Sequence, residues 1–386
     1  MQRDKRNVAL IIETSIVYGR DLLEGIVRFM RMRGNWSVFL EQRDLSRQPP
    51  SWLNEWNGDG IISRVTTPKL TEAVERTGVP LVELTDRRGK SVLPQIRAND
   101  HRIGELAAEH LIERGFRRFG YCGFRGEAWS KRREEAFLKA ANPASQESCT
   151  VYESRWFGPG TRSWDEEQAS IRAWLASIQP PFAVMACNDV RGKHVIDACE
   201  SLGLAVPEQV AVIGVDNDDQ LCRICSTPLS SVLPNAALVG FRAAELLETL
   251  MSGGTPKQQI QTVDPLGVQT RQSTDVVAIE DRDIASALHY IRRNACNGIT
   301  VDEVVRANVV SRSTLERQMR KYLGRSPQEE IRHVQIKRAR ELLVTTDLPI
   351  EKIAHLCGFD HPEYMHVVFK RITGITAGAF RRQANP

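Results

Sequence analysis

Two predicted buried strands each end in polar side chains that could bind a small ligand carrying hydroxyl groups. Residues 182–189 form an apolar run that ends in Asp189, and residues 210–217 form another that ends in Asp216 and Asn217. Carboxylates and amides accept hydrogen bonds from hydroxyls, and ligands of parallel α/β sheets bind outside the carboxyl ends of the strands. We therefore expect these three side chains to contact a small polar ligand. The alternative is that they only cap the next helix or form turns.

Four further residues are placed to complete such a site. Glu13 and Arg20 lie in the loop after a predicted first strand, residues 8–12. Trp129 and Arg133 are four residues apart, about one helical turn, so both face the same side of a helix. Arginine donates hydrogen bonds to sugar oxygens, and an aromatic face packs against the C–H surface of a sugar ring. The alternatives are solvated loop charges for Glu13 and Arg20 and core packing for Trp129.

The elements that would position this site alternate along the first two thirds of the chain. Short apolar runs at residues 36–40, 60–62 and 79–83 predict further strands, and residues 21–32 and 68–77 predict amphipathic helices between them. Repeated β-α units of this length predict parallel sheets with helices on both faces.

Two helix-turn-helix patterns lie in the last hundred residues, at residues 299–324 and 350–370. Residues 326–343 between them predict a long connecting helix. Gly358 lies at the break of the second pattern, where positive φ lets the chain reverse, and Ser311 is placed to cap the second helix of the first pattern. The apolar residues predicted to be buried in the second pattern are Ile353, Ala354, Leu356, Tyr364, Val368 and Phe369.

The positive charge of the chain is concentrated in this tail. The whole sequence has a net charge of +4, but residues 281–386 hold 18 Lys and Arg against 12 Asp and Glu, a net of +6. The remainder holds 34 against 36, a net of −2. A basic module with two recognition helices predicts binding to the phosphates and grooves of double-stranded DNA, with the helices about 34 Å apart on successive major-groove faces.

The bulk sequence favours a cytoplasmic protein. No apolar run has the length of a membrane span, and the charged start of the chain does not lead into a secretory signal, so we expect no membrane association. Eight cysteines without a regular pattern suit a reducing compartment. Cys222 and Cys225 have no second pair at ligand spacing, which favours structural cysteines, and we expect no metal site.

The tail resembles the DNA-binding domain of the AraC/XylS family of bacterial regulators. The motifs that carry the resemblance lie at residues 324–327, 336–343, 346–350, 353–354, 357–359, 369–370 and 374–376. Val309 departs from the pattern, because the family usually has a turn glycine there; we expect the fold to accommodate it. The resemblance implies that base edges are contacted by Ser313, Glu316, Arg317, His361, Glu363, His366 and Val367, and phosphates by Arg312, Arg320, Lys370 and Arg371.

Residues 7–274 are similar to the effector domain of the LacI/GalR family, which shares the two-lobed fold of periplasmic sugar-binding proteins. The similarity rests on residues 99–115, 188–189, 206–207, 212–217 and 271–274. It implies sugar contacts by Asp189, Asp216, Asn217 and an arginine at position 133. The predicted fold is thus a two-lobed α/β domain of type I periplasmic-binding-protein class, residues 1–278, followed by an all-α domain with two helix-turn-helix motifs, residues 279–386.

This combination resembles a family of xylose-responsive regulators and implies a transcription activator with D-xylose as its effector. Arg20 matches an arginine of that family, whereas Glu13 replaces a smaller amide, so another pentose or another sugar remains the alternative effector, and repression the alternative sign. The resemblance implies a homodimer that binds operator DNA and contacts RNA polymerase, with no cofactor. An enzyme is disfavoured because the sequence has no G-x-G-x-x-G after a strand, no P-loop and no nucleophile–base set.

Overall fold

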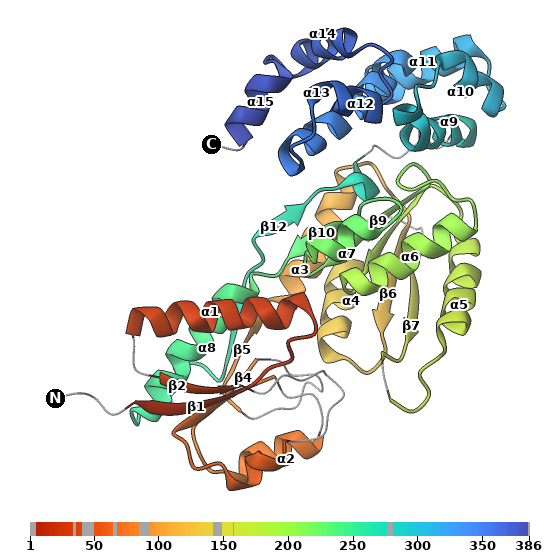
Figure 1. The fold of residues 1–386 in the computed structure, drawn as a ribbon. Helices are drawn as coiled ribbons and strands as arrows, with labels where there is room; N and C mark the ends of the chain where they lie inside the picture. Colours follow the sequence, from red (N-terminus) through yellow and green to blue (C-terminus); the bar gives the residue numbers. More distant parts are fainter. Residues whose placement is uncertain are drawn as a thin grey trace. The chain divides into compact units, whose positions relative to one another are not determined.

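The computed structural model describes residues 5–33, 36–40, 50–64, 68–84, 93–141, 149–156, 158–275 and 281–384. The chain divides into two compact units, residues 1–275 and 276–386. The first unit alternates strands and helices, and the second is helical (Figure 1). Within the described ranges, no helix combines the length and the apolar character that a membrane span requires.

The first unit contains two six-stranded sheets. One sheet has the order β11-β5-β4-β3-β1-β2, and its strands pair in parallel. Its strands are β1 (Arg6–Ile11), β2 (Trp36–Leu40), β3 (Gly60–Ser63), β4 (Leu81–Glu83), β5 (Gln95–Ala98) and β11 (Ile260–Val263). It is accompanied by α1 (Val17–Arg33), the short helix η1 (Ser51–Glu55), α2 (Pro68–Arg76) and α8 (Ala236–Met251).

The other sheet has the order β12-β10-β9-β8-β6-β7 and is parallel except for the β10–β12 pair. Its strands are β6 (Phe119–Phe124), β7 (Thr150–Ser154), β8 (Phe182–Ala186), β9 (Val210–Val215), β10 (Ser230–Leu233) and β12 (Gly267–Gln269). The chain passes between the sheets after β5, again after β10 and a third time after β11. Polar residues at the sheet edges therefore come from distant parts of the sequence.

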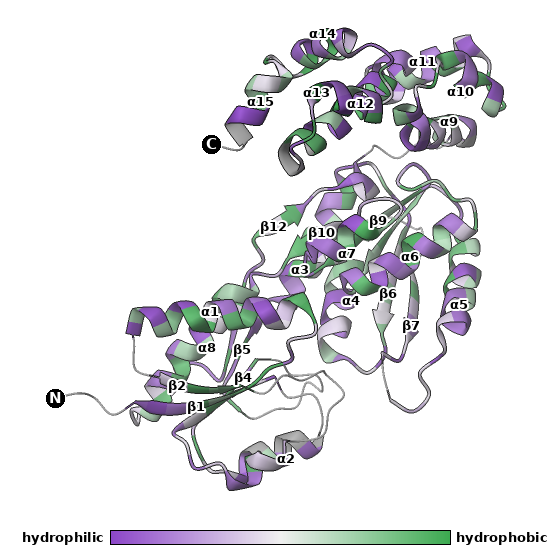
Figure 2. Ribbon diagram, viewed as in Figure 1, coloured by the Kyte–Doolittle hydropathy of each residue, from purple (hydrophilic) through white to green (hydrophobic). Residues whose placement is uncertain are grey.

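The helices of the second sheet include the one that carries Trp129 and Arg133. They are α3 (Asp100–Ile112), α4 (Ala128–Ala141), α5 (Trp164–Ala176), α6 (Asp189–Ser201), α7 (Asp219–Ile224) and the short helix η2 (Gln272–Thr274). α3 packs directly on α4, where a Cβ at Gly104 would overlap the backbone of Arg133. The central strands β6, β8 and β9 are buried along their whole length, as the apolar runs predict for parallel strands covered on both faces. Figure 2 shows that the helices carry both hydrophilic and hydrophobic residues.

The helical unit consists of two halves that share one long helix. The first half contains α9 (Arg282–Asn294), η3 (Ala295–Asn297), α10 (Val301–Ala307) and α11 (Arg312–Leu323), and the second contains α13 (Ile350–Leu356), α14 (Pro362–Thr373) and α15 (Ala377–Ala384). The predicted connecting helix is α12 (Pro327–Thr345), which begins at a capping box formed by Ser326 and Glu329. α12 contributes Ile331 to the core of the first half and Ile336 to the core of the second.

A buried amide joins the two halves. The Gln335 side chain on α12 is fully buried and donates from Nε2 to the carbonyl oxygens of Ala295, at 2.9 Å, and Gly358, at 3.0 Å. Gly358 has φ of +74°, which confirms the predicted glycine turn. Ala295 belongs to the first half and Gly358 to the turn of the second, so Gln335 fixes the separation of the two helix-turn-helix motifs.

The turn of the first motif forms without glycine. Asn308 ends α10 in an extended conformation, and its side chain donates to the Val304 carbonyl, at 2.8 Å, and accepts from Ser286, at 2.9 Å. Val309 therefore needs no positive φ and lies in solvent. The predicted cap is confirmed, because the Ser311 hydroxyl accepts from the Thr314 backbone N–H.

Two of the predicted buried residues in the second motif are wrong. Leu356 is 49% exposed and Tyr364 is 47% exposed, whereas Ile353, Ala354, Val368 and Phe369 are buried as predicted. Met365 takes the place of Tyr364 in the core. The spacing from Tyr364 to Val368 fits one helical turn, but Met365 lies equally well on that stripe, three and four residues before Val368 and Phe369, and it is fully buried. The Tyr364 ring instead packs beneath the Arg332 guanidinium, 5.0 Å away.

Candidate functional site

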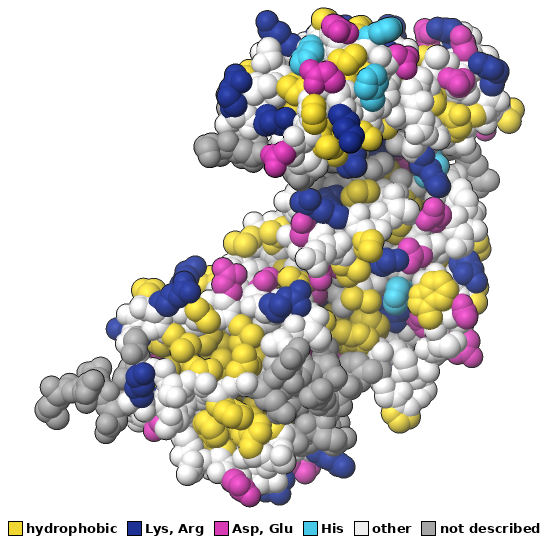
Figure 3. Space-filling view, viewed as in Figure 1, with side chains coloured by type: hydrophobic (Ala, Val, Ile, Leu, Met, Phe, Trp, Pro, Cys, Tyr) yellow, Lys and Arg dark blue, Asp and Glu magenta, His cyan; other side chains and the backbone are white. Residues whose placement is uncertain are grey.

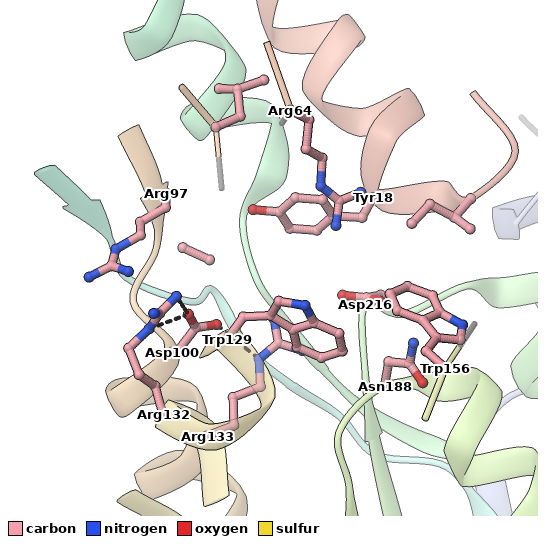
Figure 4. Close-up of a pocket in the computed structure, with 13 residues that line it drawn as sticks. Tyr18, Arg64, Arg97, Asp100, Trp129, Arg132, Arg133, Trp156, Asn188 and Asp216 are labelled. Atoms are coloured by element: carbon pink, nitrogen blue, oxygen red, sulfur yellow. Dashed lines mark hydrogen bonds and ion pairs between the residues drawn. The ribbon is translucent and has the colours of Figure 1, made fainter. Parts of the chain in front are cut away.

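A pocket lies between the two sheets of the first unit, at the carboxyl ends of their strands (Figure 4). Its empty space, including the part that opens to solvent, is about 430 Å³. It is lined by Ile16, Tyr18, Arg64, Leu84, Arg97, Ala98, Asp100, Trp129, Arg132, Arg133, Trp156, Asn188 and Asp216. The walls thus combine carboxylates, guanidinium groups, an amide, a phenol and two indoles.

A three-residue charge cluster forms one wall. Arg132 donates twice to one oxygen of Asp100, from Nε at 3.0 Å and from Nη2 at 2.9 Å. Arg133 donates from Nε to the other oxygen, at 3.0 Å, and from Nη1 to the Cys187 carbonyl, at 2.7 Å. Burial acts to lower the pKa of Arg133, but Asp100 and Asp216 outweigh it and raise that pKa further. Arg133 is therefore a fixed cation with its orientation set by two acceptors.

Two tryptophan side chains form an aromatic wall. Trp129 and Trp156 meet edge to face, with ring centroids 5.7 Å apart. Trp156 also stacks on Phe124 at 4.8 Å with an angle of 10° between the ring planes. Behind Phe124 lies Arg191, whose guanidinium carbon is 4.2 Å from the ring centroid and which pairs with Glu167. One face of the Trp156 indole is thus covered by Phe124, and Arg191 packs on the Phe124 ring in turn.

Arg64 and Tyr18 lie across the pocket from the tryptophans (Figure 4). The Arg64 guanidinium is 4.9 Å from the Tyr18 ring centroid and forms an ion pair with Glu13. Glu13 is only 3% exposed, so it is not a solvated loop charge. It does not line the pocket and instead orients Arg64, which does.

Asn188 and Asp216 close the remaining side. Asn188 caps α6, and its side-chain oxygen accepts from the Arg191 N–H at 3.0 Å, which leaves its amide N–H group for a ligand. Burial raises the pKa of Asp216 to about 6, although Arg133 and Arg64 oppose that rise. Asp216 is therefore mostly ionised near pH 7 and accepts hydrogen bonds there.

Three of the seven predicted ligand residues come together in this pocket: Trp129, Arg133 and Asp216. Glu13, Arg20, Asp189 and Asn217 do not line it. Arg20 is exposed and donates to the Thr14 carbonyl at 3.1 Å. Asp189 is buried, with one oxygen accepting from the Ser231 hydroxyl at 2.6 Å and the other from the Asp218 N–H at 2.7 Å. Asn217 accepts from Arg271 at 2.7 Å.

The rule that ligands bind at the carboxyl ends of the strands also points at residues 13–20 and at Asn188, and the structure places Tyr18 and Asn188 in the pocket. Sequence reasoning did not reach Arg64, Asp100 and Trp156. Arg64 follows a predicted strand and Asp100 begins a helix after one, so strand-end position is a usable signal for both. Trp156 lies in a loop, where no periodic pattern points to a site.

The predicted DNA contacts of the first motif lie on α11. Arg312, Ser313, Arg317 and Arg320 are exposed, and Glu316 is half-buried. Arg312 donates to Asp302 at 2.7 Å and lies 3.5 Å from Glu316, so a phosphate would compete with these carboxylates for it. The contacts themselves stay predictions.

The predicted contacts of the second motif lie on α14 and at its start. His361, Glu363, Val367, Lys370 and Arg371 are exposed, and His366 is half-buried. Val367 is 64% exposed in spite of its apolar side chain. Tyr364 joins this face as a further candidate. Figure 3 shows Lys, Arg and His side chains gathered on the visible face of the helical unit, with carboxylates among them.

The cysteine pair 222 and 225 is buried, and both thiols are free; Cys225 donates to the Leu221 carbonyl at 3.3 Å. Among the residues that the structure describes, no group of three or more His, Cys, Asp and Glu side chains is placed to hold a metal ion.

Comparisons with known protein families match nearly the whole chain. Residues 7–95 match the XylR N-terminal domain, residues 108–274 the periplasmic binding protein-like domain, and residues 304–383 a helix-turn-helix domain. The predicted fold class, a type I two-lobed domain followed by a helix-turn-helix domain, is thereby confirmed.

Individual relatives extend over the same length. The xylose operon regulatory protein of Escherichia coli K12 is 30% identical over 385 residues, covering 98% of this chain and 97% of that protein. The protein of the same name from Haemophilus influenzae is 29% identical over 382 residues, with 97% of each covered.

Solved structures agree. A structure described as the xylose-binding transcription activator XylR aligns over 100% of both chains with a TM-score of 0.86 and 28% identity. The transcriptional regulator CelR in complex with cellobiose aligns over 70% of this chain and 85% of that one, with a TM-score of 0.56 and 21% identity, a likeness of fold alone. The sequence matches, the two-sheet effector unit and the paired helix-turn-helix motifs together place this chain in the family of xylose operon regulatory proteins, which are transcription regulators.

Proposed function

We propose that this protein binds D-xylose in the pocket between its two sheets and regulates, as an activator, the transcription of genes for xylose use. The observation that carries the proposal is the pocket wall itself. Trp129 and Trp156 offer apolar ring faces beside Asp216, Arg133 and Asn188, which supply an acceptor and donors. The full-length likeness to regulators named for the xylose operon supports it.

The wall chemistry suits a neutral polyhydroxylated ligand. Each hydroxyl of a sugar donates one hydrogen bond and accepts others, so a binding site needs acceptors and donors side by side. Asp100 and Asp216 accept, while Arg133 and Arg64 donate, and each arginine is fixed by an acidic partner. A charged pair with fixed geometry recognises hydroxyls with little loss of side-chain entropy on binding.

Glu13 is the residue that favours a second candidate effector. It replaces a smaller amide of the resembled family and forms an ion pair with Arg64, which changes where that guanidinium donates. A pentose with a different arrangement of hydroxyls, or another sugar, is the alternative ligand.

The test is isothermal titration calorimetry of the full-length protein with D-xylose, L-arabinose, D-ribose, D-glucose and D-galactose. We expect D-xylose to bind tightest. Trp156→Ala removes a pocket ring and should weaken D-xylose binding about tenfold or more, equivalent to about 1.4 kcal/mol. The matched control is Trp164→Ala, because Trp164 is exposed and does not line the pocket. Tighter binding of another sugar would move the proposal to that sugar, and no binding by any of the five would overturn it.

We further propose that the protein acts as a homodimer on operator DNA and contacts RNA polymerase there. Support comes from the two exposed recognition helices in each chain and from the class of regulators to which the chain belongs. The sugar must bind one arrangement of the protein more tightly than the other, since a ligand indifferent to both shifts nothing. Size-exclusion chromatography with light scattering, with and without sugar, tests the dimer.

A further inference from the structure

The turn between β9 and α7 connects the pocket wall to the interior of the first unit. Asp216, which lines the pocket, and Asn217, which follows it, have φ of +104° and +53°. Residues other than glycine rarely adopt such values, although Asp and Asn do so more often than most, so surrounding contacts hold the turn in this conformation. Those contacts form two sets.

One set of contacts comes from β10 and α6. The Asn217 N–H donates to the Ser231 hydroxyl at 2.9 Å, and Ser231 donates in turn to Asp189 at 2.6 Å. The second oxygen of Asp189 accepts from the Asp218 N–H at 2.7 Å. Asp189 thereby holds the backbone of the turn, directly at Asp218 and through Ser231 at Asn217.

The other set comes from one arginine. Arg271 donates from Nη2 to the Asn217 side-chain oxygen at 2.7 Å and to Asp219 at 3.1 Å. It donates from Nη1 to the Leu229 carbonyl at 3.0 Å. The Arg271 side chain is only 12% exposed, and its bonds to Asn217 and Leu229 are partly buried, whereas Asp219 is 52% exposed.

Arg271 also begins the segment with which the first unit ends. Its backbone N–H donates to the Ser230 hydroxyl at 2.8 Å, and that hydroxyl donates back to the Arg271 carbonyl at 3.0 Å. Ser230 accepts as well from Thr274, whose hydroxyl lies 2.8 Å from His110. The Ser230 donor is already used, so Thr274 donates to Ser230 and His110 Nε2 donates to Thr274. One continuous network thus joins residues 271–274 to α3 and β10.

Residues 271–274 lie directly before the boundary between the two units. The first unit ends at residue 275, and the helical unit begins at residue 276. Asn217 accepts a hydrogen bond from Arg271, which lies four residues before the boundary. Asp216, which lines the pocket, is the neighbour of Asn217 in the chain. The contacts thus run from the pocket through Asp216 and Asn217 to Arg271.

We propose that Arg271 is the positioning residue that transmits occupancy of the pocket to the DNA-binding unit. A ligand on Asp216 favours one conformation of the strained turn, Asn217 carries that conformation to Arg271, and Arg271 sets the segment that leads into the helical unit. This inference rests on the proposed function, and it assigns Arg271 no contact with the sugar, since Arg271 does not line the pocket.

The test measures operator affinity with and without saturating D-xylose, by fluorescence anisotropy at fixed salt, together with sugar affinity by calorimetry. Allosteric couplings are typically about 5- to 150-fold. Arg271→Met keeps an apolar stem of similar length but removes all three side-chain hydrogen bonds. We expect its sugar affinity to stay within about threefold of the unchanged protein, and the sugar-dependent ratio of operator affinities to fall below about twofold. A ratio equal to that of the unchanged protein would overturn the proposal.

The matched control is Arg223→Ala. Arg223 donates to the same Asp219 carboxylate, at 2.9 Å, but it is exposed and no hydrogen bond of the structure links it to Asn217. It should retain the full ratio. A loss of the ratio in this variant equal to that in Arg271→Met would overturn the assignment to Arg271.

A second variant, Asn217→Gly, breaks the same hydrogen bond and keeps the proposal testable if Arg271→Met does not fold. Asn217→Gly tolerates the positive φ and removes only the amide that accepts from Arg271. We expect it to lower the coupling ratio as Arg271→Met does, and the double variant to add nothing more, because both break one link. Additive losses would overturn the pathway. If the unchanged protein binds operator DNA equally tightly with and without sugar, the proposed function is wrong, and the role of Arg271 that rests on it is wrong as well.

Discussion

Asp216 brings together an acceptor position in the pocket, a strained backbone and a raised pKa. Its carboxylate lies near Arg133 and Arg64, yet burial outweighs these cations and raises its pKa to about 6. The folded protein therefore binds this proton more tightly than the unfolded chain, whose Asp pKa is about 3.9. The contribution of Asp216 to the free energy of unfolding consequently falls as pH rises from about 4 to about 6.

The same proton makes sugar binding pH-dependent. Only the ionised carboxylate accepts hydrogen bonds with both oxygens, so we expect the dissociation constant for D-xylose to be constant above about pH 7. Below the pKa it should rise about tenfold per pH unit. Asp216→Asn should bind more weakly at pH 7 and show a flat profile. Calorimetric titrations between pH 5 and pH 8 measure both; the same affinity of the unchanged protein across this range would contradict the assignment of Asp216.

Some residues of the pocket could be predicted from the sequence and others could not. Trp129, Arg133 and Asp216 were predictable because strand ends and helical spacing place them at the sheet edge. Asp189 satisfies the same rule, but both its oxygens are used inside the protein. Nothing in the sequence distinguishes the two carboxylates, because their roles depend on Ser231 and Asp218, which come from other elements. The ion pair between Glu13 and Arg64 could not be predicted from the sequence either, because the two residues are about fifty positions apart.

At the scale of elements, periodicity predicted six of the strands and the helices of both helix-turn-helix motifs, but none of the strands after residue 229. β2 spans the predicted residues 36–40, and α12 follows the predicted connecting helix. α1 begins at Val17, before the predicted residue 21. Its first turn packs against the loop after β1, where a Cβ at Gly19 would overlap the Glu13 backbone. The predicted domain boundary after residue 278 remains a prediction. The mixed apolar spacing of α12 reflects its two cores, one in each half of the helical unit.

The turn at Gly358 gives a prediction about element packing. A Cβ at this position would lie 2.6 Å from the Gly298 nitrogen and 2.7 Å from the Cys296 carbonyl oxygen, both backbone atoms. At Gly324, which also has positive φ, a Cβ would meet nothing within 4 Å. Gly324→Ala should therefore cost only the conformational strain, about 1–2 kcal/mol. Gly358→Ala should cost several kcal/mol in total, since overlap is added to strain.

Differential scanning calorimetry of the full chain measures this difference in the transition of the helical unit. Equal shifts of its melting temperature in the two variants would show that the contact between the halves at Gly358 does not matter.

The recognition helix α11 gives a second prediction at this scale. Arg317→Ala should remove a base contact, costing about 1–3 kcal/mol and relaxing specificity at one position of the operator. Arg320→Ala should remove a phosphate contact, weakening all DNA sequences alike and reducing the salt slope by about one. Binding isotherms on operator and mutated operator at several salt concentrations separate the two. Identical salt and sequence dependence in both variants would contradict the assigned roles.

At the scale of the whole molecule, the chain consists of two units that have net charges of opposite sign and bind different partners. The first unit holds a pocket for a neutral ligand, and the second presents basic helices for DNA. Residues 271–275 end the first unit, and Arg271 among them donates hydrogen bonds to Asn217 and Asp219 in the turn that carries Asp216. Regulation by a sugar requires a coupling between the two units, and the proposed route runs through Arg271.

The most direct test of the central claim is the affinity of the full-length protein for DNA from upstream of xylose-use genes, measured by fluorescence anisotropy at fixed salt. The account predicts that saturating D-xylose raises this affinity at least about fivefold, and that L-arabinose at the same concentration leaves it unchanged. An affinity unaffected by D-xylose, in a protein that calorimetry shows to bind the sugar, would contradict the account.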